Sequence, residues 1–140
     1  MANIVPFAFK GELASGTHNF SSGGNTFKLA LYTSQATIDA STTSFTTGNE
    51  VSASGQYASG GSQLQSQQTS VASGVAIATF ANLSFTGVTL TARGALIYNS
   101  TDGNKAVCAL DFGGDKTATA GTFTIQFPAF TTAAAILRIS

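Results

Sequence analysis

Short alternations of apolar and polar residues dominate the pattern along this chain. In residues 121–127, Phe and Ile occupy every second position, and Thr and Gln fill the positions between them. Residues 27–32 repeat this spacing, with Phe27, Leu29 and Leu31 on one side. A period of two is typical of a strand that buries one face. The pattern therefore predicts half-buried strands in both segments.

A β-hairpin is predicted in the second half of the chain. Residues 93–98 and 105–112 flank residues 99–104, a run of Asn, Ser, Thr, Asp and Gly. These residue types tolerate positive φ or bond their own backbone, as tight turns require. The second arm is apolar on both sides, so we expect it in the middle of a sheet that is covered on both faces.

Further apolar runs predict additional strands and no long helix. Pro6 cannot donate a ladder hydrogen bond, so the strand that contains it belongs at a sheet edge or in an arm. The one weak helix candidate is residues 34–40, where Ser34 could cap one short turn. The further strands are expected at residues 4–9, 75–80, 82–85, 88–91 and 135–139.

Together these elements predict an all-β protein. About seven to nine short strands separated by Gly-rich turns fit a single-domain antiparallel β-sandwich, with a jelly roll or a partly closed barrel as variants. The 140 residues make one domain the expectation, with residues 1–12 as a possible N-terminal arm.

Residues 33–74 differ from the rest because Ser, Thr, Gln, Gly and Ala dominate them. A structureless loop of that length is unusual inside a domain. We expect this polar excursion to run along the sandwich or to form irregular strands, with a sharp turn at Gly60 and Gly61. Its sparse apolar anchors are Ile38, Phe45, Val51, Tyr57, Leu64 and Val71.

Charge is scarce, which narrows the classes of partner. Six Lys and Arg balance six Asp and Glu, and charged residues make up 9% of the chain, against about 25% usually. Such a chain cannot build a basic face for phosphates, so we expect no nucleic-acid partner. No apolar run is long enough for a membrane span, and residues 4–9 are too short for a secretory signal. We expect a soluble protein made in the cytoplasm, whose weakly charged surface suits assembly.

Candidate chemistry is sparse. The one histidine, His18, lies in a polar turn and is expected at the surface. The one cysteine, Cys108, lies in the doubly apolar arm and is expected to be an inert core residue, without an internal disulfide. No serine-hydrolase motif is present. We expect no catalytic residue and no cofactor, although a carboxylate pair for sugar hydrolysis stays open.

Three aspartates are candidate ligands of a hard cation. Gly113 and Gly114 would let the backbone approach an ion, but the spacing does not match an EF-hand loop, and Asp115 fits a turn equally well. No metal site is predicted from Asp102, Asp111 and Asp115.

Most of the eleven Phe and three Tyr occupy inward positions of the expected strands. Residues outside the firmest strands are better placed to touch a partner. The interface candidates are Pro6, Phe7, Phe9, Phe45 and Tyr57.

Three blocks of the sequence carry a resemblance to a known family. They are ARGALIYNSTDGNKAVCALDFGGDKTATAGTFTIQF at residues 92–127, NTFKLALYTSQATI in the first half, and QYASGG between them. With them, most of the chain resembles small virion structural proteins of tailed bacteriophages. Relatives of this size include head decoration or cement proteins, so the resemblance implies a jelly-roll fold, a place on the outer capsid surface, and a non-enzymatic role. It implies the major capsid protein and copies of the chain itself, as a dimer or trimer, as partners.

A cement protein would act through many weak contacts multiplied by symmetry. The arm with Pro6, Phe7 and Phe9 is the first expected contact, and the polar excursion is the second. The alternative is a tail or head fibre component or a host-binding adhesin domain, in which Tyr57 and the Gln/Ser-rich loop would meet a glycan. A hydrolase is the third class.

Overall fold

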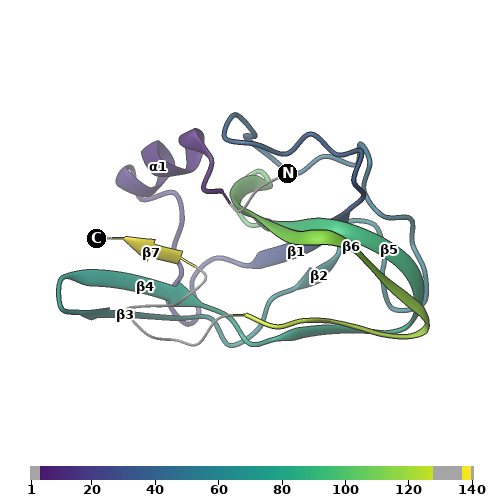
Figure 1. Cartoon of the computed structure of the whole chain (residues 1–140). Coiled ribbons are helices and arrows are strands. Elements are labelled where there is room, and N and C mark those ends of the chain that lie inside the picture. Colours follow the sequence, from purple (N-terminus) through teal and green to yellow (C-terminus); the bar gives the residue numbers. More distant parts are fainter. Residues whose placement is uncertain (1–3, 128–136, 140) are drawn as a thin grey trace.

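Two antiparallel sheets form the fold in the computed structural model, which describes residues 4–127 and 137–139 (Figure 1). The expected all-β antiparallel sandwich is confirmed, whereas the jelly-roll variant stays a prediction. The larger sheet has the order β2-β1-β5-β6 and the smaller one the order β3-β4-β7. The strands are β1 Phe27–Tyr32, β2 Ser62–Gln63, β3 Gln68–Ala72, β4 Val75–Thr79, β5 Leu83–Asn99, β6 Lys105–Ile125 and β7 Leu137–Ile139.

The main core fills the space between the two sheets. On β1, the alternation predicted from the sequence places Phe27, Leu29 and Leu31 on this inner face, each with no exposed surface. The smaller sheet contributes Ala78 from β4 and Leu137 from β7. Other members are Phe80, Phe85, Val88, Leu90, Val107, Cys108, Phe123 and Ile125.

A second core lies on the opposite face of β1, where Ala30 and Tyr32 pack with Leu96 and Tyr98 of β5. Two of the expected anchors of the polar excursion pack on this face, Ile38 buried and Phe45 half-buried. Val51, Tyr57 and Leu64 belong to the main core instead, and Val71 is exposed. Residues 62–63 and 68–72 of the excursion form β2 and β3.

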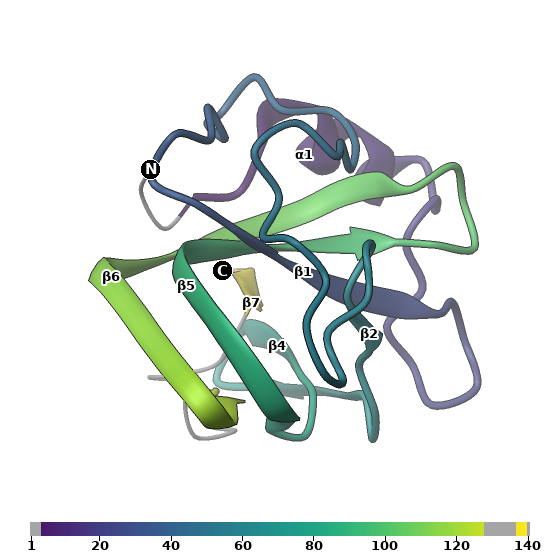
Figure 2. The ribbon, with the colours of Figure 1, turned by 90° about the vertical axis from the view of Figure 1, so that its right-hand side faces the viewer.

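The hairpin of β5 and β6 is longer than the sequence indicated. The expected strands at 82–85, 88–91 and 93–98 form one strand, and those at 105–112 and 121–127 form another. Both strands change direction midway (Figure 2). Ala92 pairs with Lys116 while Gly94 pairs with Asp111, so residues 112–115 bulge at this corner. The turn expected around Asp115 is instead this bulge.

The expected central position of residues 105–112 is wrong, because β6 ends the sheet order. The side chains are nevertheless covered on both faces, since Ala106, Val107, Cys108 and Ala109 are all buried. Antiparallel bridges close the exposed edge: Ile4 pairs with Ala109 and Ser44 with Lys105. Loops thus protect an edge that the sequence alone placed inside the sheet.

The strand expected at residues 4–9 is also wrong beyond Ile4. The chain instead forms α1, Phe7–Ala14, directly after the extended backbone of Pro6. Phe9 and Leu13 lie four residues apart, on one helix face, and pack against the main core. Gly16 follows the helix with φ +79°, the left-handed conformation that ends many helices. Residues 4–12 are therefore a bridge and a helix rather than an extended arm.

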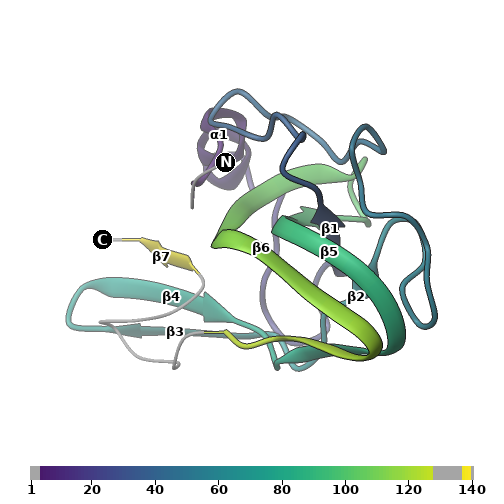
Figure 3. The ribbon, with the colours of Figure 1, turned by 45° about the vertical axis from the view of Figure 1, so that its right-hand side comes forward.

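The smaller sheet carries a hairpin that extends away from the larger sheet (Figure 3). Its strands β3 and β4 are joined by Ser73 and Gly74, both with positive φ, as a two-residue hairpin turn requires. From here on, the arm means β3, β4 and their turn, which is distinct from the N-terminal arm expected at residues 1–12. The expected strand at 75–80 is confirmed as β4, and that at 135–139 as β7 for residues 137–139, since 135 and 136 lie outside the described residues.

Candidate functional site

His18 is buried, not in the surface turn expected from the sequence. Its side chain has no exposed surface, and its ring lies 4.8 Å from that of Phe9 between centroids. The amide nitrogen of Asn99 lies 3.1 Å from Nδ1 of His18. An amide NH₂ can only donate, so Nδ1 accepts and Nε2 carries the proton. Nε2 then donates to Glu12 Oε1 at 2.9 Å.

This histidine network ties four segments of the chain together. Asn99 donates a second hydrogen bond to Oδ1 of Asn25, and its own Oδ1 accepts from the backbone of Thr101. Glu12 belongs to α1, so the network fastens the helix to the end of β5. Both ring nitrogens of His18 are occupied by these structural bonds, which leaves no nitrogen for acid-base chemistry on a ligand.

Glu50 organises the excursion over the second core. One carboxylate oxygen accepts the Tyr57 hydroxyl at 2.7 Å and the Gly60 amide at 2.6 Å. The other oxygen accepts the Ser59 hydroxyl at 2.9 Å. The Tyr57 hydroxyl in turn accepts the Leu31 amide of β1 at 2.8 Å. The carboxylate is thus a structural acceptor that holds a turn against the sheet.

Burial governs the ionisation of the three tyrosines. Desolvation, and then the nearby Glu50 carboxylate, raises the pKa of Tyr98 to about 12. Desolvation also raises the pKa of Tyr32 and of Tyr57 far above the ordinary range. All three hydroxyls therefore remain protonated donors at neutral pH, and those of Tyr32 and Tyr98 donate to the carbonyls of Thr46 and Gly60.

Cys108 is buried, as the sequence predicts, and its desolvation raises the pKa of the thiol to about 12. The thiolate is the reactive form, so a thiol in this environment is a poor nucleophile.

The three aspartates weighed as cation ligands do not converge in the structure. Asp111 accepts hydrogen bonds from the Gly113 amide and from the Arg93 guanidinium, both at 3.0 Å, and these bonds lower its pKa. Asp102 lies 3.7 Å from the Lys105 ammonium. Among residues 4–127 and 137–139, no three His, Cys, Asp or Glu residues gather as a metal site would require.

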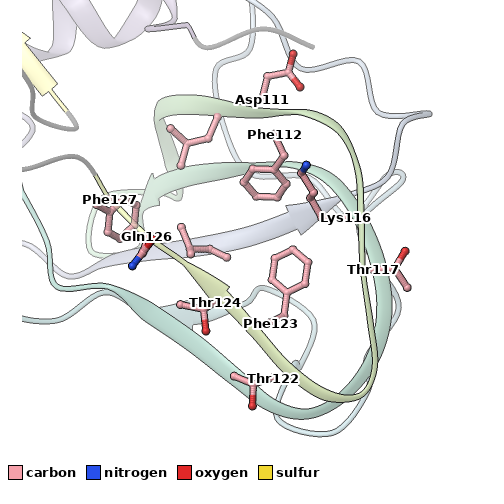
Figure 4. A pocket seen from close by; sticks show the side chains of 11 residues that line it. Asp111, Phe112, Lys116, Thr117, Thr122, Phe123, Thr124, Gln126 and Phe127 are labelled. Atoms are coloured by element: carbon pink, nitrogen blue, oxygen red, sulfur yellow. The ribbon is translucent and has the colours of Figure 1, made fainter.

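An open groove of about 500 Å³ lies on the concave side of the β6 bend. The rings of Phe112 and Phe123 point toward one another there, 6.0 Å apart between centroids (Figure 4). Polar residues also line the groove. They are Asp111, Lys116, Thr117, Thr122, Thr124 and Gln126.

The interface candidates occupy different environments. Pro6, Phe9 and Tyr57 are buried inside this chain, and Phe45 stacks on Tyr98 at 4.7 Å between centroids. Packing within the fold accounts for these four side chains. Phe7 on α1 is 67% exposed, with the Lys10 ammonium 5.7 Å from its ring. Of the five, Phe7 alone presents a large free surface.

Sequence reasoning missed the roles of Glu50 and Asn99, and for the segment that contains β3 it predicted only irregular strands or a loop. Glu50 stands seven residues before Tyr57 in a polar segment, and nothing in that spacing indicates a contact. Asn99 was assigned to a turn, where Asn is common. A signal for β3 was available, because residues 68–72 contain no charge and no Pro and precede a two-residue turn with Gly.

Comparisons with known proteins found no matching family model, no matching curated protein and no matching solved structure. In the described part of the chain, no helix is long and apolar enough to cross a membrane.

Proposed function

We propose that this protein is a non-enzymatic structural component of a phage virion, and specifically a decoration or cement protein of the capsid. In this role it bridges neighbouring major capsid protein subunits on the outer surface of the head. Three arguments support the proposal: the state of the reactive side chains, the neutrality of the surface, and the sequence blocks that resemble virion proteins.

One observation carries the proposal: the side chains most able to act in catalysis are buried or engaged in structural hydrogen bonds. His18 has both ring nitrogens engaged, and the Cys108 thiol is buried. The Glu50 carboxylate is held by three donors from its own loop. A side chain held by such structural bonds cannot reach a substrate. These bonds therefore favour a protein that binds partners through its surface over an enzyme.

Weak contacts repeated by symmetry suit this surface. Net charge is zero, and no charged residue occurs from Val51 to Ala92. Charged patches usually steer fast encounters of free proteins. A cement protein depends instead on avidity, because a copy or an oligomer that contacts several capsid subunits at once combines several weak contacts.

A reconstitution experiment tests the proposed function. Purified protein is added to phage heads assembled without it, and bound protein is measured by sedimentation with the heads. We expect saturable binding at a fixed ratio to the major capsid protein, with heads that resist heating better than undecorated heads. Heads that bind none of the protein, while whole virions carry it on their tails, would contradict the cement role.

The groove at the β6 bend favours a second candidate, a fibre component or host-binding adhesin domain. Aromatic rings beside hydroxyl, amide and charged groups are what a sugar needs, since a sugar ring stacks on aromatic faces and its hydroxyls need hydrogen-bond partners. Phe112 supplies a half-buried ring, and Lys116 and Gln126 supply exposed polar groups, whereas Phe123 is a buried core residue. The buried Tyr57 is not available for this task.

Glycan-array binding tests the adhesin candidate. The adhesin role predicts binding that Phe112→Ala abolishes and that Phe7→Ala, a change of the same type outside the groove, leaves intact. No binding to any glycan, or equal loss with both variants, would reject it.

A further inference from the structure

The outer edge of β3 presents an unpaired strand. All five residues of β3 are exposed, and β3 stands at the end of the order β3-β4-β7. Within residues 4–127 and 137–139, β4 is its one strand partner. In an antiparallel pair, every second residue directs its N–H and C=O away from the partner. As far as the described residues go, the arm therefore offers backbone donors and acceptors without a partner along its outer side.

In the part of the chain that the structure describes, this edge lacks the usual protection against pairing. Natural edge strands carry Lys, Pro or a bulge, or are covered by a loop. The edge of β6 follows this rule, since Ile4 and Ser44 bridge to it. By contrast, β3 reads Gln-Thr-Ser-Val-Ala, with no charge and no Pro, and it pairs with β4 without a register shift.

An apolar strip crosses the same arm. Val71 of β3 pairs with Ala76 of β4, which pairs with Ile139 of β7, so the three side chains lie in line on one face. Val71 is 74% exposed and Ile139 is 42% exposed. Together with Phe7 they are the exposed large hydrophobic residues of the described chain. The strip ends at the open edge of β3.

We propose that β3 pairs with β3 of a second copy of this chain, in antiparallel orientation across a twofold axis. The two arms then form one continuous six-stranded sheet, β7-β4-β3 joined to β3-β4-β7 of the partner copy. With Ser70 on the axis, Thr69 of each copy lies opposite Val71 of the other. Directly opposite residues share a face, so the two apolar strips become continuous.

The absence of charge around β3 favours a second copy of this chain as the partner of its outer edge. A twofold axis brings a surface against itself, so any charge near the axis meets a like charge. No charged residue occurs from Val51 to Ala92, which includes the whole arm. Arg138 belongs to β7, at the opposite edge of this sheet. The neutral edge is thus complementary to itself.

The size of the contact sets its strength. One pair of five-residue strands buries less surface than stable dimers usually bury. Free protein should therefore dimerise weakly, and copies held close together should pair more fully because their effective concentration is high. The inference does not rest on the capsid role, because it can be tested on the purified chain alone.

Sedimentation equilibrium of the purified full-length protein is the first test. We expect reversible dimerisation, and we expect Val71→Lys to weaken the association constant by at least about tenfold, since two lysines would then lie beside the axis. The control is Thr119→Lys, an exposed position on β6, which should dimerise like the unaltered protein. A monomer at every accessible concentration, or a dimer that Thr119→Lys disrupts and Val71→Lys does not, would overturn the proposal.

A cysteine cross-link fixes the register. Ser70→Cys places two thiols opposite each other across the axis, within the range of a disulfide. The native Cys108 is buried and does not compete. Under mild oxidation we expect a covalent dimer from Ser70→Cys and none from the control Thr119→Cys. Equal cross-linking of both variants, or of neither, would overturn the pairing across Ser70.

Discussion

The imidazole of His18 accepts a hydrogen bond from the Asn99 side chain, 3.1 Å between the nitrogens, in a place with no exposed histidine surface. This contact joins residues 81 positions apart and fastens the turn after α1 to the end of β5. A buried polar group that loses its partner keeps the full desolvation cost. The network should therefore contribute to stability well beyond its size.

Replacing His18 tests that contribution. His18→Phe fills the space but leaves Asn99 and Glu12 without their partner, so we expect a loss of about 2 kcal/mol in the free energy of unfolding. His18→Ala also opens a cavity and should cost about 3–4 kcal/mol. Urea denaturation followed by circular dichroism measures both. Ser22→Ala, at an exposed position nearby, is the control and should change stability by less than about 0.5 kcal/mol. A His18→Phe variant as stable as the unaltered protein would refute the role of the network.

Two glycines with the same backbone angle separate the effect of space from that of strain. Gly61 and Gly74 both have φ +76°, but a Cβ on Gly61 would lie 1.7 Å from the Leu29 carbonyl oxygen, whereas none of the surrounding atoms lies within 4 Å of a Cβ on Gly74. Gly74→Ala should cost about 1–2 kcal/mol for its left-handed backbone. Gly61→Ala should cost more than about 3 kcal/mol, because β1 and the turn before β2 must separate. Equal losses in urea denaturation would show that the close approach at Gly61 has no importance.

Tyrosine ionisation should make the protein sensitive to alkali. The pKa of each tyrosine is raised in the folded state, that of Tyr98 to about 12, so the unfolded chain releases these protons first. The stabilising contribution is complete below pH ~10, where unfolded tyrosine ionises, and is lost as the pH rises toward ~12. We expect tyrosinate absorbance to appear together with the loss of circular dichroism. Titration of all three tyrosines near pH ~10 in a still folded protein would contradict this.

Asp111 should contribute to the acid response. The Gly113 amide, and then the Arg93 guanidinium, lower the pKa of Asp111 in the folded state. Its stabilisation is present above the unfolded pKa of about 3.9 and is lost as the pH falls through the lower folded value. Asp111→Asn should therefore flatten the fall in the free energy of unfolding between about pH 5 and pH 2. The exposed Asp115→Asn, on the same bulge, controls for the loss of one carboxylate. An unchanged acid slope in Asp111→Asn would contradict the prediction.

The sequence predicts those parts of the fold whose periodicity is local. The alternation in Phe27–Tyr32 gives both the strand and its two faces, and the polar run before Lys105 gives the hairpin turn. The sequence does not predict that β5 and β6 continue past the bend at residues 112–115. Gly113 and Gly114 resemble a turn, and pairing across that bulge depends on the opposite strand.

Residues around α1 show a different limit. Residues 4–9 predict an edge strand, because apolar residues run through them from Ile4 and Pro6 is compatible with an edge position. The competing signal is the four-residue spacing of Phe9 and Leu13, which is too short a repeat to identify a helix by itself. The packing of this segment against the main core favours the helix over the strand. The same packing buries His18.

Candidate surfaces were less predictable than elements. The sequence predicts that aromatic residues outside regular strands are available for a partner, but Phe9, Phe45 and Tyr57 pack against the two cores of this chain, an arrangement that only the tertiary structure gives. Val71 is an aliphatic residue in a polar segment, so the sequence predicts an anchor there, whereas the structure leaves its side chain exposed. Exposure depends on what the rest of the chain covers, and a local pattern does not contain that information.

Whether phage particles carry this chain, and where they carry it, tests the proposed cement role most directly. A cryo-electron microscopy reconstruction of phage particles would locate density of this β-sandwich. The cement role predicts copies on the outer surface of the head, each in contact with at least two major capsid protein subunits. Density confined to the tail, or particles that contain none of this chain, would contradict it.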